Sequence, residues 1–188
     1  MLHGMTGSAE KMAPLAEKFC PDDWDFLVLT APLPHPKGGF AWWVRDTLVT
    51  EALDESTLLQ VQESIDFVVD NLPSEGPLIV GGFSQGAAIA QELLLTAIAD
   101  RIVGVVVIGS KAIRPLMIYE KLCELPVQRM FSMHGERDAI VPIKQADECA
   151  ILYEEAGWDV TRIRHQKGHM VDLGSEDELH NWLSKTVE

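Results

Sequence analysis

Cysteine is scarce in this sequence, and the few cysteines follow no pattern. The 188 residues include 3 cysteines, Cys20, Cys123 and Cys149, which lie far apart. This odd number fits no disulfide framework, and no CxxC pair is present to bind a metal. We therefore expect reduced thiols and a cytoplasmic location.

Positive charge and long apolar runs are also scarce. The chain has 15 Lys and Arg against 29 Asp and Glu, which gives a formal net charge of −14. Nucleic acid and anionic membrane surfaces would repel such a protein. The longest apolar run, residues 102–108, is far too short to cross a bilayer of ~30 Å, and no secretory signal is visible. We expect neither a nucleic-acid partner nor an integral membrane segment.

Internal repeats and low-complexity segments are absent as well. Apolar residues make up 47% of the sequence, and 188 residues are enough for one well-buried core but few for two ordinary domains. We predict a single domain over residues 1–188. A homodimer is left open.

Short β-branched runs alternate with longer helical patterns, which is typical of β–α units on a mostly parallel sheet. The expected strands lie at residues 25–30, 78–82, 103–108, 127–133 and 160–164. One expected helix begins after the N-cap candidate Ser8. Further helices are expected at residues 58–72, 85–98, 143–156 and 175–185, and residues 113–124 also have helical composition. We predict an α/β fold with helices on both faces of a central sheet.

Residues 31–45 contain many residues that interrupt regular structure. Three prolines and the pair Gly38-Gly39 fall in this stretch, together with Phe40, Trp42 and Trp43. So many breakers argue against a regular element, and we expect an ordered surface loop or a lid.

Residues 82–86, Gly-Phe-Ser-Gln-Gly, form the pattern G-x-S-x-G between an expected strand and an expected helix. A serine hydroxyl is a weak nucleophile, so an enzyme must expose it, place a base beside it and supply donors for the oxyanion. A sharp strand-to-helix turn exposes the serine in a strained backbone state, and its crowded flanks call for glycine. The start of the helix then faces the developing negative charge. We predict that Ser84 is a nucleophile.

Asp138 is the expected acid. It closely follows the expected strand at residues 127–133, and the loops at the carboxyl ends of parallel strands meet at one edge of the sheet. Hydrolases of this fold present serine, acid and histidine in that order, each after a strand. Glu136 and Asp147 are the competitors. Glu136 is nearer the strand end, and Asp147 falls within an expected helix.

His169 is the expected base. It follows Gly168 just beyond the last expected strand, so one ring nitrogen can take the proton from Ser84 while the other donates to Asp138. His165 is the main rival. The spacing of four between these histidines does not define one face in a β-rich stretch, and no carboxylate or thiol cluster accompanies them, so we expect no metal site. Three other histidines are interpreted as structural: His3, His134 and His180.

Residues 2–8, Leu-His-Gly-Met-Thr-Gly-Ser, contain an H-G turn ahead of the nucleophile unit. Such a turn typically brings a backbone N–H over the substrate carbonyl. We assign the two oxyanion donors to the N–H groups of Met5 and Gln85.

Taken together, these motifs resemble the phospholipase/carboxylesterase family of the α/β-hydrolase fold, which includes the acyl-protein thioesterases. The matching runs are L-H-G near the start, G-F-S-Q-G, H-G-x-x-D-x-x-V-P at residues 134–142, and Gly168-His169. The resemblance covers nearly the whole chain. It implies hydrolysis of carboxylic esters and fatty-acyl thioesters without metal or cofactor. The partner would be a small-molecule ester or acyl thioester, or an acylated protein.

Residues 41–43, Ala-Trp-Trp, also resemble the family's A-W-F segment near the acyl pocket. Aromatic residues usually belong to the core, but three of them in a Pro/Gly loop fit a hydrophobic wall for an acyl chain at least as well. We predict that Phe40, Trp42 and Trp43 line the substrate pocket.

Two other functions compete with a serine hydrolase. A dienelactone-hydrolase-like enzyme would have the same fold, but that family has cysteine at the elbow instead of Ser84. A catalytically silent α/β-hydrolase would act as a small-molecule binding module. The intact set of Ser84, Asp138 and His169 argues against such a module, because a protein without catalytic activity has no physical reason to keep a strained serine elbow.

The start of the chain departs from the family. Two residues precede His3, where the family has a whole hydrophobic strand between the strands expected at residues 25–30 and 78–82. A gap there would leave buried backbone groups unpaired, at ~1–3 kcal/mol each. Three arrangements would avoid this cost: the two neighbouring strands pair directly, another chain donates a strand, or the natural protein begins earlier with a β-rich segment. We favour the last.

Overall fold

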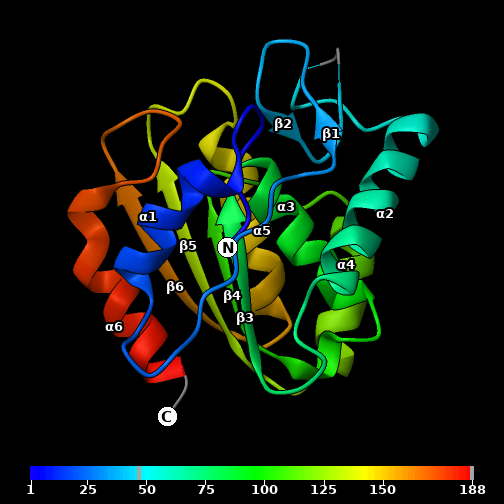
Figure 1. The fold of residues 1–188 in the computed structure, drawn as a ribbon. Helices are drawn as coiled ribbons and strands as arrows, with labels where there is room; N and C mark the ends of the chain where they lie inside the picture. Colours follow the sequence, from blue (N-terminus) through cyan, green and yellow to red (C-terminus); the bar gives the residue numbers. More distant parts are fainter. Residues whose placement is uncertain (46–47, 187–188) are drawn as a thin grey trace.

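A parallel four-stranded sheet, in the order β3-β4-β5-β6, forms the centre of the computed structural model (Figure 1), which describes residues 1–45 and 48–186. The strands are β3 (Leu78–Phe83), β4 (Ile102–Ile108), β5 (Arg129–Gly135) and β6 (Asp159–His165). Each lies close to a strand expected from the sequence. The predicted α/β class with a parallel central sheet is therefore confirmed.

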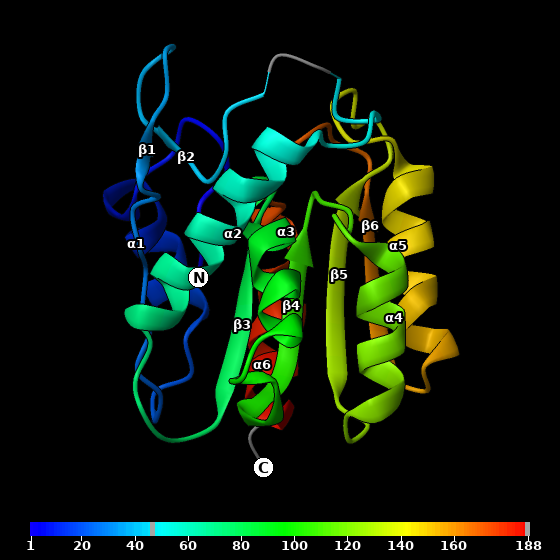
Figure 2. The same ribbon diagram turned by 90° about the vertical axis from the view of Figure 1, so that its right-hand side faces the viewer.

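Helices cover both faces of this sheet (Figures 1 and 2). One face carries α1 (Ala9–Phe19) and α6 (Glu176–Thr186), and the other carries α2 (Glu55–Asp70), α3 (Gln85–Glu92), α4 (Pro115–Glu124) and α5 (Ile143–Glu155). Side chains of β4 alternate between the two cores: Val105 and Val107 lie in the core with α2–α5, whereas Val106 and Ile108 pack with α1 and α6. Burial on both faces explains why this strand reads as a continuous apolar run.

The helix boundaries follow local chemistry. Ser8 caps α1 as expected, because its hydroxyl accepts the N–H of Lys11 at 3.4 Å. The helix expected at residues 85–98 is shorter, since α3 ends at Glu92 and continues into the 3₁₀ turns η1 (Leu93–Leu95) and η2 (Ala99–Arg101). Thr96 donates its hydroxyl to the carbonyl of Leu93 at 2.7 Å, which competes with the helical pattern. Among the helices of the described residues, none has the length and apolarity needed to span a membrane.

The strand expected at residues 25–30 is wrong. This segment forms no strand, and its pairing is a single parallel bridge between Leu29 and Leu2. Leu2 bridges Gly82 in parallel as well, so Met1 and Leu2 lie between the two segments that the sequence placed on either side of a central strand. A strand needs a partner along its length, and two residues do not provide one. The amino-terminal strand is thus shortened, as predicted.

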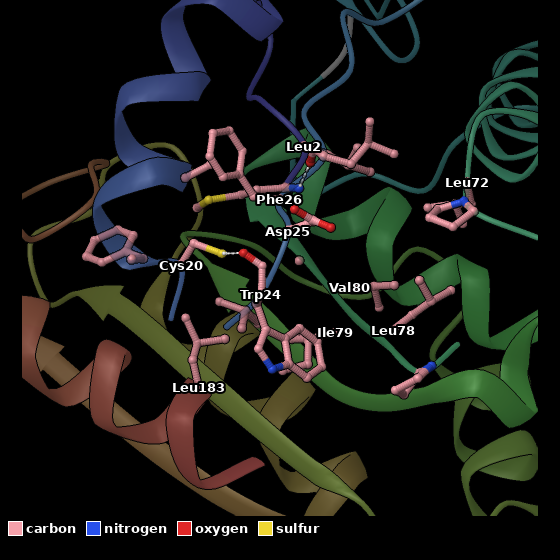
Figure 3. Close-up of a pocket in the computed structure, with 18 of the residues that line it drawn as sticks. Leu2, Cys20, Trp24, Asp25, Phe26, Leu72, Leu78, Ile79, Val80 and Leu183 are labelled. Carbon is pink, nitrogen blue, oxygen red and sulfur yellow. Dashed lines mark hydrogen bonds between the residues drawn. The ribbon is translucent and has the colours of Figure 1, made fainter. Parts of the chain in front are cut away.

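A cavity of about 470 Å³ lies beside Leu2 in this part of the molecule (Figure 3). Trp24 and Phe26 line one wall, and Ile79 of β3 lines another. The cavity is lined by residues of α1 and α6 from one face of the sheet and by residues of α2 from the other face. It therefore extends through the plane of the sheet. The sheet is therefore well packed from β3 to β6. It is loosely packed along the edge of β3 that faces Leu2, which we call the loosely packed side.

The segment at residues 31–45 is more regular than expected. It contains a short antiparallel pair, β1 (Leu33–Pro34) with β2 (Phe40–Ala41). A tight turn closes the pair, because His35 N–H donates to Gly39 O and Gly38 N–H donates to His35 O, both at 2.9 Å. Positive φ angles at Gly38 and Gly39 make this turn accessible. The glycines and prolines of this segment therefore allow a β-pair, but each of its strands is only two residues long.

Candidate active site

Ser84 lies at the turn between β3 and α3. Its φ of 52° and ψ of −118° lie outside the helix and strand regions, so its backbone is strained as the elbow pattern predicts. Space is tight on both flanks. A Cβ on Gly82 would lie 2.5 Å from the carbonyl oxygen of Leu2, and one on Gly86 would collide with the carbonyl oxygens of Leu2 and His3. Close approach of the backbone therefore requires both glycines.

The three residues singled out in the sequence meet at the carboxyl edge of the sheet. Ser84 follows β3, Asp138 follows β5 and His169 follows β6. Ser84 Oγ is 3.0 Å from His169 Nε2, and His169 Nδ1 is 2.7 Å from Asp138 Oδ2. A carboxylate only accepts, so Nδ1–H donates to Asp138 and Nε2 is left to accept the Ser84 proton. The arrangement can move a proton from Ser84 to His169.

Asp138 is held by the backbone of its own loop. Its side chain is fully buried, and Oδ1 accepts the N–H groups of Ile140 at 2.8 Å and Val141 at 2.9 Å. Burial raises the pKa of this carboxyl, but the hydrogen bonds from His169, Val141 and Ile140 outweigh burial and the pKa lies below its ordinary value. His134, 3.4 Å from Oδ2, donates from Nε2 to the carbonyl of Val141 at 2.8 Å. Asp138 is thus an ionised acceptor with a fixed orientation.

The imidazole of His169 is positioned by packing and by its loop. Its ring packs against Phe83, with ring centroids 4.8 Å apart. The loop is fastened by Asp172, which accepts from Lys167 Nζ at 2.5 Å and from Ser175 Oγ at 3.0 Å. These bonds, the one from Lys167 above all, lower the pKa of Asp172 to about 2. Sequence reasoning missed Asp172, although a carboxylate three residues after the expected base was a visible signal.

The competing residues have other partners. Glu136 accepts a hydrogen bond from Gln166, and Asp147 pairs with Arg164 at 2.6 Å. Within residues 1–45 and 48–186, neither carboxylate bonds to His169. His165 is buried, and its Nδ1 accepts the N–H of Lys167 at 3.3 Å. The geometry therefore favours Asp138 and His169 over their rivals.

The H-G turn lies directly against the nucleophile. A Cβ on Gly4 would lie 3.4 Å from Cβ of Ser84. The turn is tied to β2, because Thr6 N–H donates to Phe40 O at 2.8 Å. In the described part of the chain, the N–H groups of Met5 and Gln85 donate to no protein group, and the first N–H groups of a helix have no partner within it. Both N–H groups are available to an oxyanion.

Buried side chains hold this turn, and sequence reasoning did not foresee them. Gln85 Oε1 accepts the N–H of Trp42 at 3.2 Å, and its Nε2 donates to Trp43 O at 2.8 Å. Trp42 Nε1 donates to His3 O at 2.8 Å, and His3 Nε2 accepts the N–H of Ala31 at 2.9 Å. Burial lowers the pKa of His3, which fits a neutral ring. The glutamine of the G-F-S-Q-G run therefore bridges the elbow to the backbone of residues 42 and 43.

The aromatic residues expected in the substrate pocket are largely internal. Trp42 is 0% and Trp43 is 5% exposed, and both belong to the core cluster on the α2–α5 face. Phe40 is half-buried and packs against the same cluster. Trp42 thus packs in the core, which is the alternative that the sequence left open for these aromatic residues. A role of Phe40, Trp42 and Trp43 in acyl selectivity stays a prediction.

Comparisons with known proteins show which family and fold this chain resembles. A family model described as serine hydrolase (FSH1) matches residues 1–174. A search of curated proteins gives no match. Among solved structures, the Bacillus cereus carboxylesterase has a TM-score of 0.75 at 22% identity, covering 98% of this chain and 86% of its own. Zea mays acyl-protein thioesterase 2 has a TM-score of 0.74 at 20% identity, covering 100% of this chain and 92% of its own.

These likenesses confirm the predicted α/β-hydrolase fold, and the solved neighbours carry the names of the enzymes that the motifs resemble. The family model covers the elbow, Asp138 and His169 alike. The chain therefore belongs to the FSH1 family of serine hydrolases.

Proposed function

We propose that Ser84, His169 and Asp138 form a catalytic triad that hydrolyses carboxylic esters and acyl thioesters through an acyl-enzyme intermediate. The observation that carries the proposal is the continuous hydrogen-bond path from Ser84 Oγ through His169 to Asp138, at 3.0 Å and 2.7 Å. This path links a strained nucleophile to an ionised acceptor, which is the arrangement that acyl transfer needs.

In the first half-reaction, Ser84 Oγ attacks the acyl carbon while its proton moves to His169 Nε2. Asp138 stabilises the imidazolium that forms. The tetrahedral intermediate collapses as the bond to the alcohol or thiol breaks, and His169 returns the proton to that leaving group. Water then attacks the acyl-Ser84 ester with His169 as base, which releases the carboxylic acid and regenerates Ser84.

The oxyanion of each tetrahedral intermediate is assigned to the N–H groups of Met5 and Gln85. Support comes from the closeness of Gly4 to Ser84, where an added Cβ would lie 3.4 Å from Cβ of Ser84, and from the lack of protein acceptors for both N–H groups in the described residues. Preorganised backbone donors stabilise the transition state without reorganisation, and losing one costs about 10²–10³ in kcat in comparable enzymes.

An apolar acyl group is the favoured substrate portion. Three exposed apolar side chains stand beside the proposed catalytic groups: Met5 at the oxyanion turn, Ile140 near Asp138, and Met170 next to His169. They are 43%, 52% and 46% exposed, and an apolar chain would cover them. The neighbours named carboxylesterase and acyl-protein thioesterase agree with this choice, and an acylated protein is a substrate under the same proposal.

The silent binding module is not favoured, because the hydrogen-bond path through His169 is intact. A reducing, cytoplasmic setting remains part of the proposal and is supported by the three free cysteines of the chain. A homodimer is a separate prediction, which light scattering measures directly.

A fluorophosphonate probe tests the nucleophile. We expect wild-type protein to be labelled at Ser84 alone, and Ser84→Ala to fold normally, lose labelling and lose ~10⁶-fold in kcat. Ser110, Ser132 and Ser175 are buried serines that should remain unlabelled. Labelling at another serine, or hydrolysis that survives in Ser84→Ala, would contradict the proposal. A panel of neutral esters and acyl thioesters of graded length then identifies the preferred acyl group.

A further inference from the structure

Ser110 contacts the nucleophile from a loop to which the sequence assigns no function. The loop follows β4, which pairs with β3 and β5. Ser84 N–H donates to Ile108 O at 2.8 Å, and Ser110 Oγ donates to Ser84 O at 2.8 Å. The hydroxyl has one proton, and its other carbonyl neighbour, Lys111 O, is farther away at 3.4 Å. The last residue of β4 and the loop that follows it therefore bind both backbone groups of Ser84.

The carbonyl that Ser110 binds belongs to the same peptide group as the N–H of Gln85. The ψ angle of Ser84 sets the direction of this peptide plane, and its value of −118° at φ 52° is one that the local backbone does not favour by itself. Ala88 N–H, in α3, is a second donor to the same oxygen at 3.1 Å. A donor on a carbonyl oxygen also polarises the amide, which makes its N–H a stronger donor.

The loop that carries Ser110 is anchored to α3 by buried side chains. Gln91 Nε2 donates to Lys111 O at 3.3 Å, and the carboxylate of Glu92 accepts the N–H of Arg114 at 3.2 Å and its Nε at 2.5 Å. Gln91 and Glu92 are both 0% exposed, and Ser110 is 4% exposed. The hydroxyl of Ser110 is therefore kept in place and away from water.

We propose that Ser110 is a positioning residue: its hydroxyl orients and polarises the Ser84–Gln85 peptide group so that the Gln85 N–H points at the oxyanion. The inference rests on the proposed function, in which Gln85 is an oxyanion donor. Only the transition state and the tetrahedral intermediates carry the charge that this donor meets. The effect therefore falls on kcat and leaves substrate binding unchanged.

Two substitutions at Ser110 and one control test the role. Ser110→Ala should lower kcat on a neutral ester about tenfold with KM unchanged, which is a fraction of the loss expected from deleting a donor outright. Ser110→Thr keeps the hydroxyl and should restore most of kcat. Thr96→Val is the matched control, because Thr96 also donates its hydroxyl to a backbone carbonyl, Leu93 O at 2.7 Å, but beyond the far end of α3. It should leave kcat unchanged.

A trifluoromethyl ketone analogue of the ester supplies a readout that a merely structural role would not move. Its adduct with Ser84 carries an oxyanion, so Ser110→Ala should weaken this inhibitor by the same factor as kcat. The pH dependence of kcat should stay as in wild type, since Ser110 forms no hydrogen bond with His169 within residues 1–45 and 48–186. If Ser110→Ala unfolds below the assay temperature, Ser110→Cys takes its place, because a thiol of similar size is a weak donor.

An unchanged kcat and inhibitor affinity in a folded Ser110→Ala protein would overturn the role of Ser110. An equal loss in Thr96→Val would overturn it too, because the effect would then be general destabilisation. Fluorophosphonate labelling of the wild type separates the two levels of inference. Labelling at Ser84 with no effect at Ser110 defeats the positioning role alone, whereas the absence of labelling at Ser84 defeats the proposed function.

Discussion

On one side of Ser84, main-chain hydrogen bonds link each strand end to the next. Ser84 N–H donates to Ile108 O at 2.8 Å, Gly109 N–H to Met133 O at 2.9 Å, and Glu136 N–H to His165 O at 2.8 Å. The proposed triad stands on these loops. On the other side, the pairing that the described residues give β3 is reduced to the bridge of Leu2 with Gly82, and the cavity of about 470 Å³ lies beside it (Figure 3).

The H-G turn at residues 2–8, which carries the proposed oxyanion donor Met5, lies on the loosely packed side, and side-chain hydrogen bonds hold it there. The indole of Trp42 and the ring of His3 bind the backbone of the turn and of Ala31, while Gln85 binds the backbone of residues 42 and 43. Main-chain pairing depends little on which side chains are present, but these contacts depend on three particular residues. We therefore expect the geometry of the proposed triad to resist core substitutions better than the geometry of the H-G turn does.

Asp138→Asn tests the well-ordered side at its most important acceptor and should have the largest effect. The retained oxygen can still accept the N–H groups of Ile140 and Val141, so we expect a folded protein. The amide cannot orient His169 and stabilise its charged form, so kcat should fall by ~10³–10⁴. Steady-state kinetics on a neutral ester measure this loss.

Asp147→Asn is the control for that experiment, because Asp147 lies in α5 and pairs with Arg164 of β6, so the change should leave kcat unchanged. A loss under tenfold in Asp138→Asn would move the orienting role to another acid, with Glu136 the first to test.

Trp42→Phe tests the loosely packed side. It removes the donor to His3 O and leaves that carbonyl unpaired, at ~1–3 kcal/mol. We expect kcat to fall by about tenfold, equally on acetate and on longer acyl chains, because the turn that carries Met5 loses its anchor. Rates on esters of graded length give the comparison.

Trp158→Phe is the matched control, since Trp158 is 4% exposed and its indole N–H has no partner among the described residues. A change in acyl selectivity in Trp42→Phe, in place of a uniform loss, would instead support the predicted wall of Phe40, Trp42 and Trp43.

A strand added to the loosely packed side should have the smallest effect. Leu2 N–H donates to Gly81 O and Phe83 N–H donates to Leu2 O, so the backbone of odd-numbered β3 residues faces the cavity. About ten residues of Val/Ile-rich sequence fused ahead of Met1 should pair there. Each hydrogen bond gained contributes about 1 kcal/mol, and each kcal/mol raises Tm by about 2–4 °C in a chain of this size.

A Gly/Ser extension of equal length is the control for the fused strand and should leave Tm unchanged. If the Val/Ile-rich extension raises neither Tm nor the rate, the cavity does not accept a strand, and the assignment of Met5 to the oxyanion loses support.

The sequence by itself was sufficient for the features that depend on local chemistry. Strands β3, β4 and β5 were visible as largely apolar runs and β6 as a short run with β-branched residues. Gly82 and Gly86 marked the elbow because a tight turn excludes a Cβ. The order of Ser84, Asp138 and His169 along the chain predicted their meeting, since the loops after parallel strands share one edge. Nothing in that reasoning required knowing which distant side chains touch.

The tertiary structure decided what depends on partners far apart in the sequence. Trp42 anchors a residue 39 positions away, and Gln85 binds a backbone 43 positions away. The segment at residues 25–30 has the composition of a strand but lacks a partner along its length, and the hydroxyl of Ser110 gains its meaning from the carbonyl of Ser84, 26 positions away. Pairing and burial are properties of two surfaces together, so neither segment alone contains them.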